Sequence, residues 1–206
     1  MARLLVIHHT PSPDTHAMLH SVCDGATAAA DELGGDLEVV LRPALAAVVP
    51  DVLDADGYLL GTPANFGYMS GALKHFFDTV YYPCLDATRG RPWGLWVHGN
   101  NEVDGAALAV QRIVTGLGWS AVRPPVLVVG SPTVDASERL WELGAVSRKY
   151  SRRCRRSMTS GTRTRKASWP SCWMRWMPRA ANCTLMRSSW VTQISCSAAS
   201  TRRFTV

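Results

Sequence analysis

The feature that most constrains the fold is a regular alternation of short, mainly apolar runs with stretches of helical periodicity. Five apolar runs have the length of buried strands, at residues 4–7, 37–41, 58–60, 94–97 and 126–129. Between them, apolar residues recur three and four positions apart, as on one face of an α-helix. These residues are Met18, Leu19, Val22 and Ala26; Leu73, Phe76, Phe77 and Val80; Leu108, Ile113 and Leu117; and Leu140 with Leu143. Apolar strands followed by helices predict a parallel α/β sheet covered on both faces.

The connections between these elements restrict the topology further. Residues 50–56 leave room for a short helix at most between the second and third strands. Gly34 and Gly35 are expected to end the first helix, and Asp135 with Glu138 indicates a capping pair for the last helix. Right-handed crossovers then give a three-layer, doubly wound domain. Five strands favour the flavodoxin-like order 2-1-3-4-5 over the six-stranded dinucleotide-binding fold.

Length and composition limit the setting in which the protein works. The 206 residues suffice for one ordinary domain with an appended segment. The apolar run that ends at His8 is too short for a signal peptide or a membrane span, so we expect a cytoplasmic protein. The six cysteines show no CxxC spacing, which predicts free thiols and no metal site.

Charge divides the chain near residue 147. Residues 1–147 contain all 16 acidic residues and 8 of the 22 Lys and Arg residues, a net charge of −8, whereas residues 148–206 contain 14 basic residues and no acid. We therefore predict a folded domain over residues 1–146 and an Arg-, Ser-, Trp- and Cys-rich tail over residues 147–206.

Two interpretations of this tail differ in kind. A basic arm with interspersed Trp residues suits nucleic acid. A GC-rich gene translated out of frame would also accumulate Arg, Ser, Trp and Cys and lose its acids. Because the composition changes inside the last predicted helix, we favour the second interpretation. We therefore expect no nucleic-acid partner and a tail without a packed core.

In a doubly wound sheet, ligands bind beyond the carboxyl ends of the strands. After the first strand, Thr10, Ser12 and Thr15 surround the start of a helix, where hydroxyls and free backbone NH groups favour an anion. The chain has neither GxGxxG nor a Walker lysine, so a single phosphate is the expected anion. The alternative is that these hydroxyls are ordinary helix caps.

The loops after the third and fourth strands suit a flat heterocycle. Gly61 and Gly67 permit tight backbone turns around Pro63, Asn65 and Phe66, which would offer a polar edge and an aromatic face. The alternative is an ordinary loop with Phe66 packed in the core.

The second of these loops, residues 98–101, contains Gly99, Asn100 and Asn101, whose amides could meet an imide edge. His98 is its titratable residue and the candidate catalytic group, although a lone histidine is more often structural. His75 is expected on the surface of a helix.

Two motifs carry a resemblance to a known family. The pattern T-x-S-x-x-T at residues 10–15 resembles the flavodoxin phosphate loop. The stretch ADGYLLGTPANFGYMSGALKHFFD, residues 55–78, is similar to the GTPxxFG region of flavodoxin-like NAD(P)H:quinone oxidoreductases of the tryptophan-repressor-binding type and of related FMN reductases. The resemblance covers residues 1–146, although Pro11 and Pro13 remove two NH groups where relatives often have glycine.

This resemblance implies a role for each loop. It implies that Thr10, Ser12 and Thr15 bind the FMN phosphate, that Thr62, Pro63, Asn65, Phe66 and Gly67 frame the isoalloxazine, and that His98, Gly99, Asn100 and Asn101 face its pyrimidine edge.

The resemblance also implies an activity: hydride transfer from NADPH or NADH to FMN, followed by reduction of a small quinone-like acceptor, in a protein that is often a homo-oligomer. A one-electron carrier of the flavodoxin type, steered by its acidic surface, is the alternative. A flavin fold without activity is a further possibility.

Overall fold

The computed structural model describes residues 2–32 and 37–159, and all of these belong to one compact unit, Met1–Thr164. Gly34 and Gly35, predicted to end the first helix, lie outside the described residues, as do residues 160–206 of the predicted tail. The predicted domain boundary after Val146 falls within a helix that continues to Thr159, and it stays a prediction.

The core of this unit is a mixed but mainly parallel sheet. Its parallel strands are β1 (Ala2–His8), β2 (Leu37–Pro43), β3 (Gly57–Asn65), β5 (Pro92–Gly99), β6 (Ser120–Ala121) and β7 (Val126–Val129). A short strand, β4 (Tyr68–Met69), pairs antiparallel with β3. Both β6 and β7 pair with β5, so together they form one interrupted edge strand. The predicted order 2-1-3-4-5 is therefore confirmed, with β5 as the fourth strand and β6 with β7 as the fifth.

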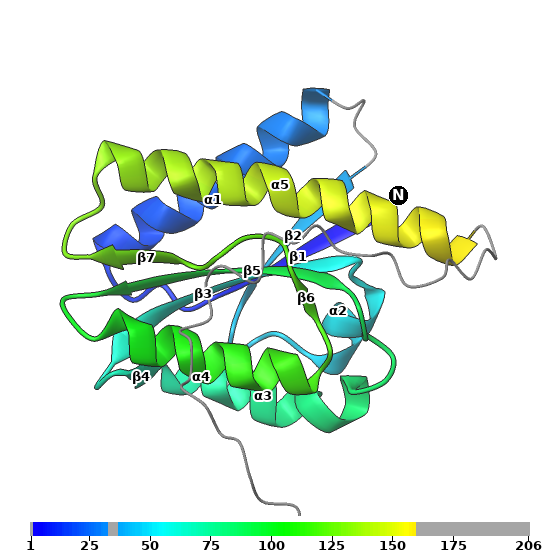
Figure 1. The fold of residues 1–206 in the computed structure, drawn as a ribbon, viewed down its shortest axis with the longest axis horizontal. Coiled ribbons are helices and arrows are strands. Elements are labelled where there is room, and N and C mark those ends of the chain that lie inside the picture. The colour runs from blue at the N-terminus through cyan, green and yellow to red at the C-terminus, as the bar shows by residue number, and fades with distance from the viewer. Residues whose placement is uncertain (1, 33–36, 160–206) are drawn as a thin grey trace, which may run out of the picture. The chain divides into compact units, whose positions relative to one another are not determined.

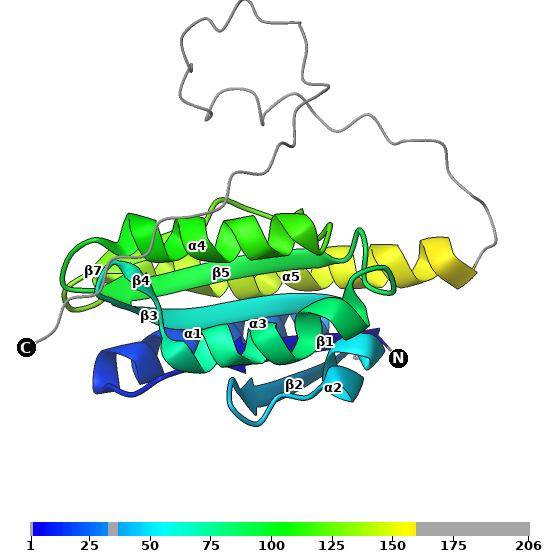
Figure 2. The same cartoon turned by 90° about the horizontal axis from the view of Figure 1, so that it is seen from below.

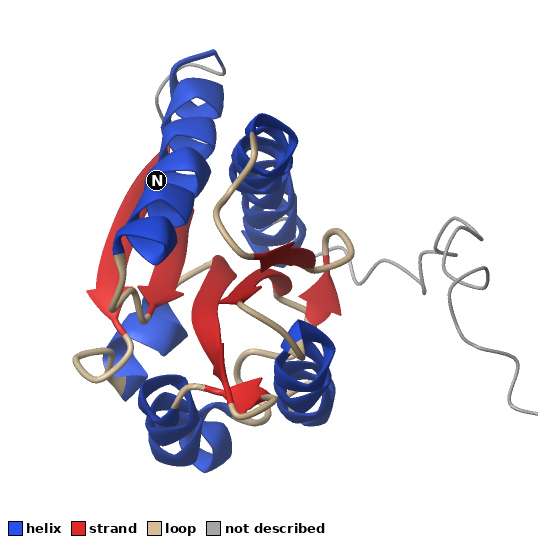
Figure 3. Cartoon of the chain, turned by 90° about the vertical axis from the view of Figure 1, so that its left-hand side faces the viewer, coloured by secondary structure: helices blue, strands red, loops and turns tan. Residues whose placement is uncertain are grey.

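Five helices cover the two faces of the sheet. They are α1 (Pro13–Glu32), α2 (Val49–Asp54), α3 (Gly71–Cys84), α4 (Val103–Gly116) and α5 (Val134–Thr159). Helices α1 and α5 lie side by side on one face, and α2, α3 and α4 lie on the other (Figures 1 and 2). Viewed from the side, helices flank the strands in the three predicted layers (Figure 3).

Alternation along each strand divides the apolar residues between two cores. On β1, Leu4 and Val6 belong to the core shared with α1 and α5, whereas Leu5 and Ile7 belong to the core shared with α2, α3 and α4, and all four are fully buried. An uninterrupted apolar strand is required because both of its faces are covered.

Helix α4 buries only part of the predicted apolar stripe: Leu117 is fully buried and Ile113 packs against the core, but Leu108 does not. Leu108 is 48% exposed, and the small side chains of Ala106, Ala107, Ala109 and Val110 are buried instead. The prediction was wrong for Leu108 because it weighted large apolar residues, whereas much of the buried face of this helix consists of alanine and valine.

The start of α5 also differs from the prediction. The Thr133 hydroxyl accepts a hydrogen bond from the Ala136 NH at 3.2 Å, so Thr133 caps the helix. Asp135 instead forms an ion pair with Arg139 at 3.0 Å, one turn further on.

Within residues 2–32 and 37–159, no helix has the length and hydropathy needed to cross a membrane.

Candidate functional site

The loops after β1, β3, β5 and β7 meet at the carboxyl edge of the sheet. The His9 NH donates to the Gly61 carbonyl at 3.0 Å, which joins the first loop to β3. The Gly130 NH donates to the Gly99 carbonyl at 2.9 Å, which joins the last loop to the end of β5. The loops after β1, β3 and β5, which contain the site residues predicted from the sequence, thus lie at one edge of the sheet.

The start of α1 is closed by a reciprocal pair of hydroxyl residues. Ser12 precedes the helix, and its Oγ accepts a hydrogen bond from the Thr15 NH at 3.3 Å. Thr15 Oγ1 accepts from the Ser12 NH at 3.0 Å and donates to the Ser12 carbonyl at 2.8 Å. Thr15 is only 2% exposed, so its hydroxyl shapes the loop. Its role as a phosphate ligand stays a prediction.

Thr10 is placed differently from Thr15. It is half-buried, and its Oγ1 lies 3.1 Å from Nδ1 of His8. A hydroxyl can donate to one partner and accept from another. Thr10 is therefore the loop threonine best placed to offer a hydroxyl to an anion.

Residues 65–68 form a tight hairpin between β3 and β4. Asn65 pairs with Tyr68, and the two central residues, Phe66 and Gly67, have φ angles of 53° and 70°. Two successive positive φ angles are typical of a type I′ turn, which favours Asn-Gly. Phe66 is fully exposed, so the alternative that it packs in the core is wrong. An aromatic residue here adopts an unfavourable backbone conformation and contributes nothing to the core.

Buried hydroxyls fix the base of this hairpin. Thr62, 2% exposed, lies with its Oγ1 3.1 Å from Ser70 Oγ and accepts from the Ser70 NH at 3.0 Å. Ser70 Oγ in turn accepts from the Leu73 NH at 3.3 Å and so caps α3. Pro63 is buried beside β5. Thr62 and Pro63 therefore support the hairpin, whereas Asn65 and Phe66 project from it.

The hairpin turn contacts the start of α4. A β-carbon at Gly105 would lie 2.2 Å from the Gly67 carbonyl oxygen, and one at Gly67 would lie 3.0 Å from the Glu102 carboxylate. Glu102, which precedes α4, has a φ of 47°. Phe66 and Glu102 are the two non-glycine residues with positive φ in the described part of the chain, and both belong to this contact.

The loop after β5 combines two exposed amides with an anchored histidine. Asn100 and Asn101 are exposed, whereas Gly99 is buried at the end of the strand. His98 Nε2 lies 3.0 Å from the Gly130 carbonyl and 3.8 Å from the Asp14 carboxylate. Because a carbonyl can only accept, Nε2 carries the proton in this contact. His98 thus links the ends of β5 and β7 to the start of α1.

The histidines around α1 were not among the predicted site residues. The pKa of His8 is lowered by burial and, to a smaller extent, by the positive charges that His16 and His9 would carry. Nδ1 of His9 is buried and has no hydrogen-bond partner within the described residues. This cluster of histidines was visible in the sequence, because four of the six histidines lie within residues 8–20. In the described part of the chain, no cluster of His, Cys, Asp or Glu has the geometry of a metal site.

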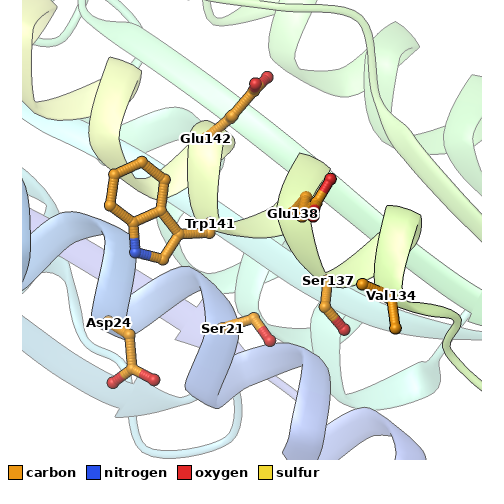
Figure 4. A pocket seen from close by; sticks show the side chains of 7 residues that line it. All are labelled: Ser21, Asp24, Val134, Ser137, Glu138, Trp141 and Glu142. Carbon is orange, nitrogen blue, oxygen red and sulfur yellow. The ribbon is translucent and has the colours of Figure 1, made fainter.

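A separate hollow of about 450 Å³ lies between α1 and α5 (Figure 4). It is lined by Ser21, Asp24, Val134, Ser137, Glu138, Trp141 and Glu142. The Glu142 carboxylate also accepts from Arg123 at 2.5 Å. None of the sequence-predicted site residues contributes to this hollow.

The side chains at the carboxyl edge suit a phosphorylated aromatic ligand. Hydroxyls and a helix start are the donors that bind a phosphate. The exposed ring of Phe66 offers an aromatic face, and the amides of Asn100 and Asn101 offer donors and acceptors. The chemistry of these residues therefore fits a flavin mononucleotide.

Comparisons with solved structures show the fold. An oxidoreductase from Corynebacterium diphtheriae superimposes with a TM-score of 0.63, at 18% identity, covering 74% of this chain and 98% of that one. The two-electron reduced flavodoxin of Megasphaera elsdenii gives 0.60, at 21% identity, covering 71% and 98%. A WrbA-like flavodoxin from Agrobacterium tumefaciens gives 0.57, at 15% identity, covering 76% and 99%. The flavodoxin-like fold expected from the sequence is thus confirmed.

Sequence comparison shows the family. A flavodoxin from Aquifex aeolicus (strain VF5) is 40% identical in an alignment of 129 residues that covers 58% of this chain and 63% of that protein. The family model described as NADPH-dependent FMN reductase matches residues 18–133. This match spans more than half of the chain and includes the hairpin and the loop after β5, and the protein therefore belongs to the NADPH-dependent FMN reductase family.

Proposed function

We propose that this protein binds FMN at the carboxyl edge of its sheet and transfers electrons from NADPH or NADH through FMN to a small acceptor such as a quinone. The observation that carries this proposal is the hairpin at Phe66. A fully exposed aromatic residue held at a φ of 53° stabilises no core, so its presence in this turn is best explained by contact with a ligand.

Each loop would hold one part of FMN. Thr10, Ser12 and the start of α1 would bind the phosphate, and Thr15 would keep Ser12 in place. The hairpin residues Asn65, Phe66 and Gly67 would lie against the isoalloxazine, supported from below by Thr62 and Pro63. The amides at Gly99, Asn100 and Asn101 would meet the pyrimidine edge. When bound, FMN supplies the redox chemistry, and the protein supplies binding, orientation and electrostatics.

His98 has two candidate roles, which differ in what they require. Its Nε2 proton is directed to the Gly130 carbonyl, which supports a positioning role at the junction of the loops. A catalytic role would require His98 to exchange a proton with the substrate or the cofactor. Replacement by Gln, which retains a donor, would preserve turnover in the first case. In the second case it would remove a pH dependence from kcat.

The identities of the electron acceptor and of the electron donor are both proposals. We expect a small-molecule acceptor that stacks on the exposed face of the flavin, and a homo-oligomer in the cytoplasm. A specific observation favours the carrier alternative: the Aquifex aeolicus relative, 40% identical over 129 residues, is named a flavodoxin. A carrier would exchange single electrons with a protein partner and would not oxidise NADPH by itself.

One set of measurements on the full chain tests these alternatives. The purified protein is reconstituted with FMN, and NADPH and NADH oxidation is followed with and without a soluble benzoquinone. Turnover that depends on both FMN and quinone is the expected result. FMN binding without NADPH oxidation would favour the carrier. If FMN does not bind at all, the proposed function is wrong.

A further inference from the structure

The segment that would bind the phosphate contains no lysine or arginine. Residues 4–41, which include β1 from Leu4 onward, the following loop and α1, lack both residue types, and Arg3 lies near the opposite end of β1. Arg42, at the end of β2, bonds to Asp51 at 3.2 Å and to the Leu41 carbonyl at 3.2 Å. A phosphate dianion at the start of α1 therefore has no permanent cation from this segment to balance its charge.

The backbone of the loop offers few donors in compensation. Pro11 and Pro13 have no NH group. The Ser12 NH donates to Thr15 Oγ1, and the His9 NH donates to the Gly61 carbonyl. The match to the family model begins at residue 18, after this loop.

Histidines occupy the same region, and they are close enough to influence one another. The charges of His9 and His16 oppose protonation of His8, after the larger effect of burial. Nδ1 of His9 is buried and has no hydrogen-bond partner among residues 2–32 and 37–159, which is an uncommon state for a polar atom. Nδ1 of His8 lies 3.1 Å from the hydroxyl of Thr10. A ligand that brought negative charge here would satisfy His9 and remove the mutual repulsion.

Other titratable groups near this region come from α1 and β5. On α1, Asp14 lies in the first turn and His20 lies on an exposed position one turn beyond His16. From β5, His98 approaches Asp14 at 3.8 Å. Asp14 would oppose an anion at the start of the helix. Binding of a phosphate at the start of α1 therefore requires positive charge that also offsets the negative charge of Asp14.

We propose that His9, with His8 and His16 beside it, is a proton-dependent anion site that binds the phosphate of FMN. This inference rests on the proposed function, because FMN is the source of the phosphate. Binding of the dianion takes up a proton from solvent onto the histidine cluster, so a neutral imidazole becomes the imidazolium that pairs with the phosphate. No other bond forms or breaks. Recognition of FMN would then weaken as the pH rises, whereas recognition of riboflavin would not.

Calorimetric titration of the full-length apoprotein tests this proposal. FMN and riboflavin are each titrated at pH 7.5 in two buffers that differ in ionisation enthalpy. The expected result is an uptake of up to one proton with FMN and none with riboflavin. Between pH 7 and pH 9, where the FMN phosphate is already a dianion, FMN affinity should fall by up to tenfold per pH unit. Equal proton uptake with both ligands would overturn the proposal.

Matched variants identify the residue responsible. His9→Asn keeps a polar group near the position of Nδ1 but cannot become a cation, so it should lose most of the proton uptake and bind FMN about tenfold more weakly. His75→Asn, on the exposed face of α3, should behave as the parent protein. Unchanged uptake in His9→Asn would overturn the assignment, and thermal melting of both variants shows whether they fold.

A further titration separates this inference from the proposed function. Phenyl phosphate carries the anion without the flavin, and NMR of the histidine ring protons reports its binding in the parent protein. If FMN binds without proton uptake, the inference fails and the proposed function stands. If FMN does not bind but phenyl phosphate raises the pKa of His9, the anion site is real and the proposed function fails.

Discussion

Gly105 of α4 lies so close to Gly67 of the hairpin that a β-carbon at position 105 would stand 2.2 Å from the Gly67 carbonyl oxygen. The neighbouring Glu102 carboxylate would stand 3.0 Å from a β-carbon at Gly67. The turn that contains Phe66 therefore packs directly against the backbone of α4. Its position depends on the absence of a side chain at residue 105.

Gly105→Ala should displace the hairpin. An alanine inside a helix normally adds stability, but here the backbone contact must open, and we expect a loss of about 2 kcal/mol in the free energy of unfolding. FMN affinity and turnover should fall with it. Gly71→Ala is the control, because a β-carbon there would meet nothing within 4 Å. Urea unfolding and FMN titration of both variants check this, and an unperturbed Gly105→Ala protein would contradict it.

Phe66→Asn should separate stability from function. Asn tolerates positive φ and is favoured at this position of a type I′ turn, so the free energy of unfolding should rise by about 1 kcal/mol. The aromatic face is lost at the same time, so FMN should bind more weakly and its spectrum should change. Phe66→Ala removes the ring but keeps the strained φ, and it should therefore weaken FMN without stabilising the protein. A stability loss in Phe66→Asn would show that Phe66 packs against other residues.

Much of the fold could be predicted because strands that are covered on both faces are mainly apolar, and such runs are visible in the sequence. The run at residues 126–129 matches β7, and all five predicted strands were found. The hairpin of β3 and β4 was missed because its turn contains Phe66 where the pattern calls for Asn. The stripe on α4 was misplaced at Leu108 because alanines that permit close packing give a weak apolar signal.

The loops of the candidate site could be predicted from the sequence, but the contacts of their individual residues could not. Hydroxyl and glycine patterns identified the loops, because strand ends of a parallel sheet converge. They could not show that Thr15 and Thr62 are buried and bonded to Ser12 and Ser70, since these contacts depend on the packed geometry. The same holds for His98, whose partner Gly130 is 32 residues away.

Thr10 and Thr15 should respond differently to substitution. Thr15→Val removes a buried hydroxyl that bonds to the Ser12 backbone, so we expect a loss of about 2 kcal/mol in the free energy of unfolding. Thr10→Ala should leave stability nearly unchanged and weaken FMN by about 1.4 kcal/mol, a factor of roughly ten. Fluorescence titration with FMN and thermal unfolding distinguish the two effects. Equal FMN affinity in Thr10→Ala and the parent protein would exclude Thr10 from the phosphate site.

The apoprotein should lose stability in mild acid. The pKa of His8 is held below its ordinary value of 6.5 in the folded state, chiefly by burial. Below pH 6.5 the unfolded chain therefore binds more protons at this residue than the folded chain does. This contribution to stability is complete above pH 6.5 and is lost as the pH falls toward the folded pKa. Melting temperatures from pH 7.5 to pH 5 should show the decline, and His8→Gln should reduce it. An unchanged pH profile in that variant would exclude His8 as the source.

A chain that ends at Val146 should keep FMN binding. The buried side chains described on α5 include Ala136, Leu140, Leu143 and Ala145, and all precede the point where the composition changes. Removing residues 147–206 takes away 14 basic residues and no acid, so the core of the sheet and the loops at its carboxyl edge should remain. We expect FMN affinity within about twofold of the full chain, because surface changes away from a site usually alter free energies by less than about 0.5 kcal/mol.

The tail itself is tested by sequencing the gene around codon 147. If the tail results from translation out of frame, a shift of one base should restore an ending that contains acidic residues and helical periodicity. A sound reading frame, together with loss of FMN binding on truncation, would show that residues 147–206 are a genuine and necessary part of the protein. Because those residues are strongly basic, the same truncation should also convert a chain of net charge +6 into one that is net acidic. Ion-exchange behaviour of the truncated chain checks that change directly.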